Sequence, residues 1–83
     1  MNFVDLYNSE TNWGKKVIIM ELFHLSHVVM REGWTIRRTA EEFHCSIGLT
    51  SENLRLAHAI HEKPEILDCE TRQDALKKVN GRI

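Results

Sequence analysis

Residues 35–57 have the sequence TIRRTAEEFHCSIGLTSENLRLA, and this stretch decides the fold. Thr35 and Ser46 belong to the residue types that cap helices, because their hydroxyls accept hydrogen bonds from the free amides of the first turn. Apolar residues at helical spacing follow each of them. The stretch therefore predicts one helix over 36–43, a tight turn, and a second helix over 47–61.

Two helices joined by so short a turn favour a helix-turn-helix over residues 35–61, whose second helix is offered to the major groove of DNA. One side of the second helix should pack on the first helix and consists of Ile47, Thr50, Leu54 and Ala57. The opposite side is polar and small, and it consists of Gly48, Ser51, Glu52 and Arg55. We expect this polar side to face DNA.

The residue types on that side suit base recognition. Arg55 can donate two hydrogen bonds to one guanine, and Ser51 can contact a base edge. Glu52 can either accept a hydrogen bond from a cytosine amine or repel phosphates and so disfavour wrong sites. Ser46, at the positive end of the second helix, can help to hold a phosphate. A surface ion pair of Arg55 with a neighbouring glutamate, Glu52 or Glu62, is the alternative.

Two arginines, Arg37 and Arg38, open the first helix, although cations are disfavoured at a helix N-terminus. This placement suggests contacts with DNA phosphates. The alternative is that they form ion pairs one turn further on with Glu41 and Glu42.

An apolar helix is predicted over residues 13–31, with residues 1–12 loosely ordered before it. The centre of its apolar face is formed by Ile18, Leu22, Leu25 and Val29. The apolar arc covers roughly 240°, well beyond the roughly 100° of a surface helix. Such a helix is either central to the fold or shared with another chain, and we expect a homodimer interface that includes Ile18, Leu22, Phe23 and Met30.

The C-terminal segment over 64–80 is also predicted to be helical. Pro64 ends the preceding helix, and Thr71 is placed to cap a last helix that runs to about Val79. The 83 residues therefore form one domain, 1–83, of the all-α class: a small bundle of about four helices that contains the helix-turn-helix. A domain this short buries only about 60% of its unfolded surface, so a partner would add stability.

Composition sets limits on partners and location. The net charge of −1 provides no bulk attraction to DNA, so a DNA-binding face must arise from the way the fold sorts its charges. Two cysteines do not make a disulfide framework, and no secretory signal opens the chain. The apolar run over 17–30 contains Glu21 and two histidines and should not cross a membrane. We expect a cytoplasmic protein.

The order of residues resembles the helix-turn-helix of ParB/KorB-type partition proteins over roughly residues 34–79. The matching positions are Ala40, Ser46, Leu54-Arg55-Leu56, Pro64-Glu65-Ile66 and Ala75-Leu76. Short phage-encoded helix-turn-helix proteins are more similar still, since they share the Ser-Glu-x-Leu-Arg-Leu-Ala run found here over 51–57. The resemblance implies sequence-specific and usually dimeric binding of double-stranded DNA, in a bacterium or a phage-infected host.

The chain departs from that family in three respects. His44 stands at the turn position where glycine is usual, and Thr50 stands where valine or isoleucine is usual. Histidine tolerates the left-handed backbone that this turn needs. The nucleotide-hydrolysing and dimerisation regions of partition proteins have no counterpart, so the resemblance implies a DNA-binding module, such as a small transcriptional regulator, and not partitioning.

Other classes of function fit the sequence less well. Two histidine pairs, His24 with His27 and His58 with His61, have a spacing compatible with zinc, but they lie on separate predicted helices without a Cys-x-x-Cys element. No glycine-rich phosphate loop or nucleophile elbow is present, so we expect neither an enzyme nor a bound cofactor. The main alternative is a protein-interaction adaptor that docks on a polymerase, nuclease or other regulator.

Overall fold

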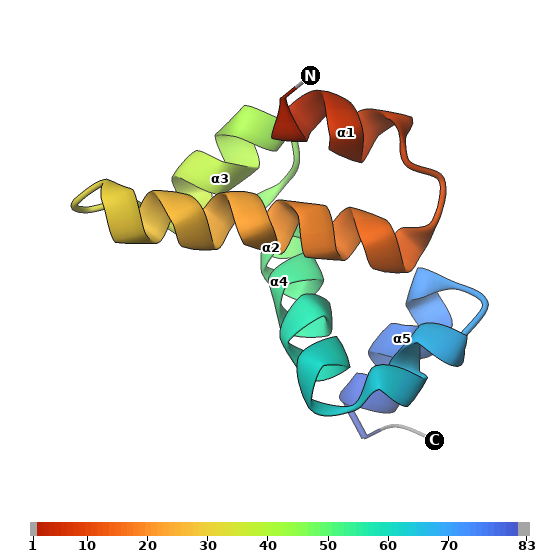
Figure 1. The fold of residues 1–83 in the computed structure, drawn as a ribbon. Helices are drawn as coiled ribbons and strands as arrows, with labels where there is room; N and C mark the ends of the chain where they lie inside the picture. The colour runs from red at the N-terminus through yellow and green to blue at the C-terminus, as the bar shows by residue number, and fades with distance from the viewer. Residues whose placement is uncertain (1, 82–83) are drawn as a thin grey trace.

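The helix α4 packs against more of the other helices than any other element does in the described residues. The computed structural model describes residues 2–81, and it has five α-helices and one 3-10 helix in this range. These are α1 (Phe3–Ser9), α2 (Trp13–Met30), α3 (Ile36–Phe43), α4 (Ile47–Glu62), η1 (Pro64–Asp68) and α5 (Arg72–Val79). α4 packs against α2, α3, η1 and α5 (Figure 1). The prediction of a small all-α bundle is confirmed.

The N-terminal segment was predicted wrongly as loosely ordered. Residues 3–9 form α1, which packs on α2 (Figure 1). The side chain of Asn2 caps it by accepting a hydrogen bond from the Asp5 amide at 2.8 Å. Tyr7 anchors the helix, because its ring is buried with edge-to-face contact to Phe43 at 5.1 Å between centroids. Residue 1 lies outside the described residues.

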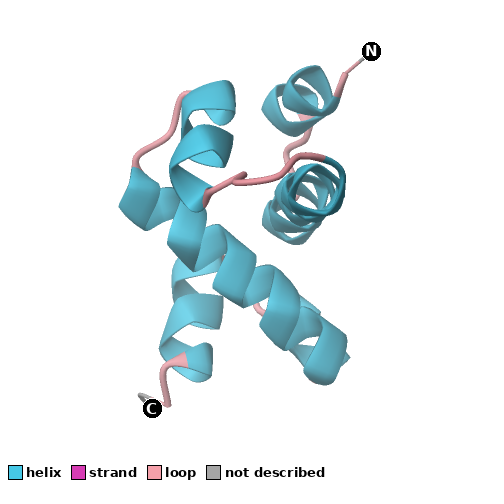
Figure 2. Ribbon diagram, turned by 90° about the vertical axis from the view of Figure 1, so that its left-hand side faces the viewer, coloured by secondary structure: helices cyan, strands magenta, loops and turns pink. Residues whose placement is uncertain are grey.

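The position of α2 in the sequence was predicted correctly, but the face of the helix that is buried was not. The helix lies across α4 in Figure 1 and is seen nearly end-on in Figure 2. Its buried side comprises Gly14, Val17, Met20, Glu21 and Phe23. Of the four residues expected at the centre of the apolar face, Ile18 is half-buried against the core, but Leu22 and Leu25 are each 51% exposed and Val29 is 83% exposed.

Polar partners explain why α2 turns this side inward. The buried carboxylate of Glu21 lies 2.7 Å from Nε2 of His61 on α4. Nδ1 of His24 lies 2.7 Å from the hydroxyl of Thr39 on α3. Because α2 is apolar around most of its circumference, hydrophobicity alone leaves its rotation nearly free, and these specific contacts help to fix it.

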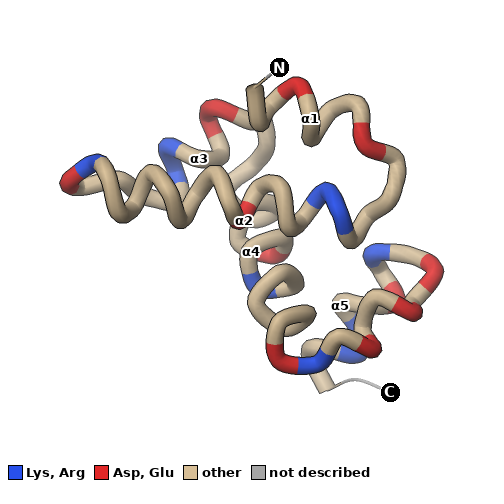
Figure 3. Tube along the Cα trace, in the orientation of Figure 1, with Lys and Arg blue, Asp and Glu red and all other residues tan. Residues whose placement is uncertain are grey.

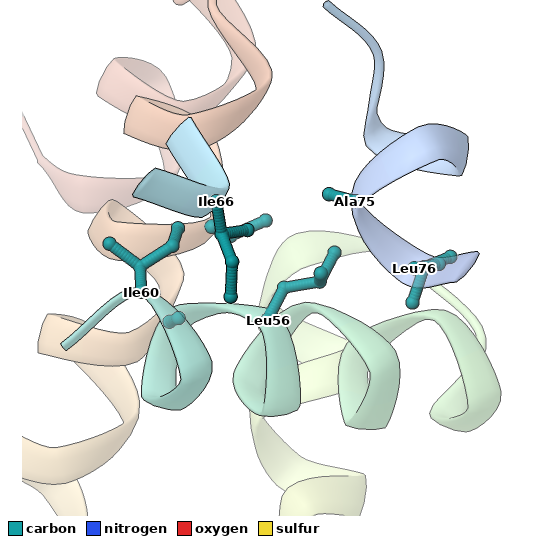
Figure 4. Packing of buried hydrophobic residues seen from close by; sticks show 7 residues of the cluster. Leu56, Ile60, Ile66, Ala75 and Leu76 are labelled. Atoms are coloured by element: carbon teal, nitrogen blue, oxygen red, sulfur yellow. The ribbon is translucent and has the colours of Figure 1, made fainter. Parts of the chain in front are cut away.

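Two clusters of buried side chains form the core. One lies between α2, α4, η1 and α5, and Figure 4 shows Leu56 and Ile60 of α4 pointing towards Ile66 and the α5 residues Ala75 and Leu76. The other lies between α1, α2 and α3 and consists of Tyr7, Met20, Phe23 and Phe43. α2 contributes to both clusters, and α4 contributes Leu54 to the rim of the second.

The C-terminal segment agrees with expectation. Pro64 begins the 3-10 helix η1, and the hydroxyl of Thr71 caps α5 by accepting from the Asp74 amide at 3.1 Å. The indole N–H of Trp13 donates to the carbonyl of Cys69 at 3.0 Å, which ties this segment to the start of α2. Cys45 and Cys69 are both free thiols. Within residues 2–81, no helix has both the length and the apolar character that crossing a bilayer requires.

Candidate nucleic-acid interface

The connection between α3 and α4 is built by local hydrogen bonds. The Cys45 amide donates to the Ala40 carbonyl at 3.0 Å, and the His44 amide donates to the Glu41 carbonyl at 3.2 Å. His44 has φ 55° and ψ 42°, so it takes the left-handed conformation predicted for it. This pair of bonds satisfies two of the carbonyls in the last turn of α3, and the chain then enters the next helix.

Both predicted caps of this segment are confirmed. The Thr35 hydroxyl accepts from the Arg38 amide at 3.4 Å, and the Ser46 hydroxyl accepts from the Leu49 amide at 3.0 Å. The structure thus has two capped helices joined by a short turn at the predicted residues. The Ser46 oxygen accepts in this cap, so its O–H and the free backbone amides of the first turn of α4 remain able to donate to an anion.

One side of α4 is open, and it carries four of the predicted DNA-contacting residues. Ser46, Gly48, Ser51 and Arg55 are all exposed. An added Cβ at Gly48 would meet nothing within 4 Å, so the surface beside the first turn of α4 is unobstructed by the described chain. The guanidinium of Arg55 makes no ion pair within residues 2–81, so the alternative of pairing with Glu52 or Glu62 does not hold there. No described element covers this side.

Glu52 does not share that environment. It is half-buried, and its Oε1 lies 2.9 Å from the guanidinium of Arg72 on α5. Nε of Arg72 also donates to Oδ1 of Asn53 at 2.7 Å. The carboxylate predicted to accept from cytosine is therefore held by an arginine that the sequence analysis did not single out.

Arg37 and Arg38 lie exposed on the first turn of α3. Neither forms an ion pair with Glu41 or Glu42 in the described part of the chain. The guanidinium of Arg38 lies over the ring of Trp34, 4.7 Å from its centroid. Stacking of this kind fixes the side chain while leaving its N–H groups available to an anion.

Charge is segregated along α3. In Figure 3 the beginning of the helix is blue and its end is red, which corresponds to Arg37 and Arg38 at one end and Glu41 and Glu42 at the other. The positive end is the one nearer to the turn between α2 and α3 (Figure 3). A polyanion would meet favourable charge at the start of α3 and at Arg55, and repulsion at the end of α3.

The residues predicted for a dimer interface divide into two sets. Leu22 and Met30 are exposed, at 51% and 82%, and Ile18 is half-buried. Phe23 is only 7% exposed and lies in the core, where its ring meets Phe43 edge-to-face at 5.0 Å. Phe23 is therefore unavailable to a partner, and its place in the predicted interface was wrong.

The histidines take part in separate local contacts. His24 hydrogen bonds with Thr39, His27 stacks on Phe23 at 4.0 Å, and His61 contacts Glu21. Nε2 of His58 lies 3.3 Å from Oε1 of Glu62 one turn away. Across residues 2–81, His, Cys, Asp and Glu side chains do not gather in threes as metal ligands would.

Two titratable groups have perturbed pKa values, the half-buried His24 and the buried Tyr7. Burial lowers the pKa of His24, and the neighbouring charge of His27 lowers it further. Burial also raises the pKa of the Tyr7 phenol, against the opposing effect of its hydrogen bond from Asn53. The Nδ2 group of Asn53 donates to the Tyr7 hydroxyl at 3.1 Å, so α1, α4 and α5 are linked through Tyr7, Asn53 and Arg72.

Sequence reasoning missed this linked set for identifiable reasons. Asn53 is 1% exposed, and its position one turn before Ala57 on a buried stripe of α4 was a signal that its amide needs partners. Nothing local identifies those partners, since Tyr7 and Arg72 are distant in sequence.

Comparisons with known proteins identify no similar protein or family. No protein-family model matches the chain, and neither the curated proteins nor the solved structures contain a match. The similarity to ParB/KorB-type domains consequently stays a prediction from sequence.

Proposed function

We propose that the protein is a small, sequence-specific double-stranded DNA-binding regulator without catalytic activity, which uses α3, the turn and α4 as a helix-turn-helix. The observation that carries the proposal is the open side of α4, where Gly48, Ser51 and Arg55 are exposed behind a capped N-terminus. The proposed setting is the cytoplasm of a bacterium or a phage-infected host, and the proposed role is transcriptional regulation by a phage or mobile element.

Base recognition would fall chiefly to Arg55. A guanidinium can donate two hydrogen bonds to guanine O6 and N7, which discriminates against other bases by about 1–3 kcal/mol. Ser51 lies one turn earlier on the same side and is short enough to bring the helix close to the base edges. Gly48 adds no side chain at the point where the start of α4 would approach the backbone.

Phosphate contacts would come from Arg37, Arg38 and the first amides of α4. These groups fix the orientation of a protein on the duplex without reading its sequence. Each neutralised phosphate contributes about 0.9 to the slope of log affinity against log salt. The net charge of −1 favours a weak sequence-independent background, so the affinity should depend on these few local cations.

The role of Glu52 is revised in this proposal. Its carboxylate is paired with Arg72, so it neither repels phosphate as a free charge nor is free to accept from a cytosine. We assign it to the orientation of α5 on α4. We also propose that the protein binds DNA as a homodimer, since two copies present two helices to successive half-sites.

The test is selection of bound sequences from random duplexes at moderate salt, performed with the wild type and with Arg55→Ala. We expect a defined motif that loses information at one base-pair position in the variant. Lys77→Ala is the matched control, because Lys77 is an exposed cation on α5, and it should leave the motif intact. A full motif with Arg55→Ala would reject Arg55 as a base reader, and absence of binding in dilute buffer would reject the function.

A protein-interaction adaptor is the second candidate, and the exposed Glu41 and Glu42 at the end of α3 favour it. In that case the α3–α4 surface would dock on a polymerase, nuclease or other regulator through its mixed charges. The adaptor would be favoured if the wild type binds no duplex but captures a defined protein. Reversing the charge of Glu41 should then abolish the capture of that protein.

A further inference from the structure

The outer face of α2 is an apolar stripe that the described chain leaves uncovered except at Ile18, which is half-buried against the core. Ile18, Leu22, Leu25 and Val29 follow one another at alternating spacings of four and three residues. The opposite side of α2 already packs on the core through Val17, Met20 and Phe23. Leu22 and Leu25 are half exposed, and Val29 and Met30 at the end of the helix are more than 80% exposed. Leaving so much apolar surface in water is costly, and a contiguous patch of this kind marks an interaction site.

The spacing of the stripe indicates what covers it. Apolar residues that alternate at four and three along a helix form the seam by which two helices pack side by side. The seam carries no charged residue between Ile18 and Val29, so a strongly acidic or basic partner would find no complement on it. An identical seam is complementary to it in both length and polarity. We propose that a second copy of this chain packs on this face, with the two α2 helices antiparallel.

Charges at the ends of the stripe select the antiparallel direction. Lys15 lies on the stripe just before Ile18, whereas Glu32 lies in the turn that follows α2, two residues after Met30; both are exposed. In an antiparallel pair centred between Leu22 and Leu25, Lys15 of each copy lies beside the turn of the other copy that carries Glu32. A parallel pair would instead oppose lysine to lysine and glutamate to glutamate, which is unfavourable.

The shape of the surface agrees with this register. A hollow of about 290 Å³ lies beside the beginning of α2, and it is lined by Glu10, Gly14, Lys15, Ile18, Ile19 and Leu67. Leu67 on η1 is 47% exposed at its edge. The antiparallel register brings Val29 of one copy opposite Ile18 of the other, so the projecting end of each α2 lies against the hollow of its partner. This interface rests on the proposed homodimer and is independent of DNA binding.

The first test measures the molar mass of the full chain by sedimentation equilibrium from micromolar to submillimolar concentration. We expect the wild type to form a dimer and Leu25→Glu to weaken dimerisation by at least about tenfold, because a carboxylate would be buried in the seam. Gln73→Glu adds the same charge at an exposed position on α5 and should dimerise like the wild type. Circular dichroism checks that each variant is folded. A wild type that stays monomeric, or a dimer unaffected by Leu25→Glu, would overturn the proposal.

A charge exchange tests the direction of pairing. Lys15→Glu alone and Glu32→Lys alone should each weaken the dimer several-fold, since each opposes like charges twice in a symmetric pair. The double variant should restore the affinity. Failure of the double variant to recover would reject the antiparallel register.

The outcome is separable from that of the DNA-binding test. Arg55→Ala should dimerise like the wild type, because Arg55 lies on α4 and outside the stripe. A dimer that binds no duplex would leave this interface standing and would remove only the DNA-binding function.

Discussion

His44 holds a conformation that its side chain disfavours. Its φ of 55° lies in the left-handed region, and its imidazole is exposed. An L-residue there costs about 1–2 kcal/mol, whereas glycine pays no steric penalty. The turn between α3 and α4 is therefore formed against a local cost, which the two backbone hydrogen bonds that close α3 offset.

We predict that His44→Gly stabilises the protein by about 0.5–1 kcal/mol, the relief of strain less the extra freedom of glycine in the unfolded chain. Urea denaturation measures the change. Gly33→Ala is the opposite case, because Gly33 has φ 78° with nothing near its missing Cβ. This substitution should cost about 1 kcal/mol through backbone strain alone. Destabilisation by His44→Gly would show that the imidazole contributes a contact which outweighs the strain.

At the scale of elements, α1 is the helix that the sequence did not predict. Its seven residues are too few for a stable isolated helix, so its order depends on packing. Tyr7 is the residue that α1 buries, and it lies against Phe43 and under the ammonium of Lys16, which is 4.4 Å from the ring centroid.

We predict that Tyr7→Ala lowers the free energy of unfolding by about 3–5 kcal/mol, because it removes a buried aromatic ring and leaves the Asn53 amide without its acceptor. Asn8→Ala, at an exposed position of the same helix, should change stability by less than about 0.5 kcal/mol. Urea denaturation in the cold distinguishes the two variants. Equal stability of Tyr7→Ala and the wild type would mean that α1 does not dock.

The elements differ in how far sequence predicts them. Thr35, Ser46 and Thr71 mark helix starts through bonds to amides three residues away, so their signal is local and the predicted boundaries hold. The rotation of α2 was not predictable, because it depends on contacts of Glu21 and His24 with α4 and α3. The open side of α4 was predicted from periodicity, whereas the pairing of Glu52 with α5 was not.

At the scale of the whole molecule, His24 couples stability to pH. It lies between α2 and α3, where its Nδ1 contacts a Thr39 hydroxyl that also accepts from the indole N–H of Trp34 at 2.8 Å. A neutral imidazole can accept the Thr39 hydroxyl proton through Nδ1, whereas a charged imidazolium cannot. Since the pKa of His24 is lowered in the folded state, the unfolded chain binds a proton more readily.

We predict that the titration of His24 does not change the free energy of unfolding well above about pH 6.5, where the imidazole is neutral in both the folded and the unfolded state. As the pH falls below that value, the titration should lower the free energy of unfolding. The measurement is the free energy of unfolding of the wild type and of His24→Gln between about pH 7.5 and pH 5. Glutamine keeps a hydrogen-bonding group but does not titrate, so the wild type should lose more stability than the variant. Parallel pH profiles would contradict the prediction.

The division of the core into two clusters has a consequence for motion. α1 and α3 belong to one cluster and η1 and α5 to the other, while α2 and α4 contribute to both. Amide protons of α2 and α4 should accordingly exchange with solvent slowest, since freeing them disrupts both clusters. We expect α1 and α5 to open separately, because each belongs to a different cluster and, within residues 2–81, they share only the hydrogen bonds that Tyr7 and Arg72 make to Asn53.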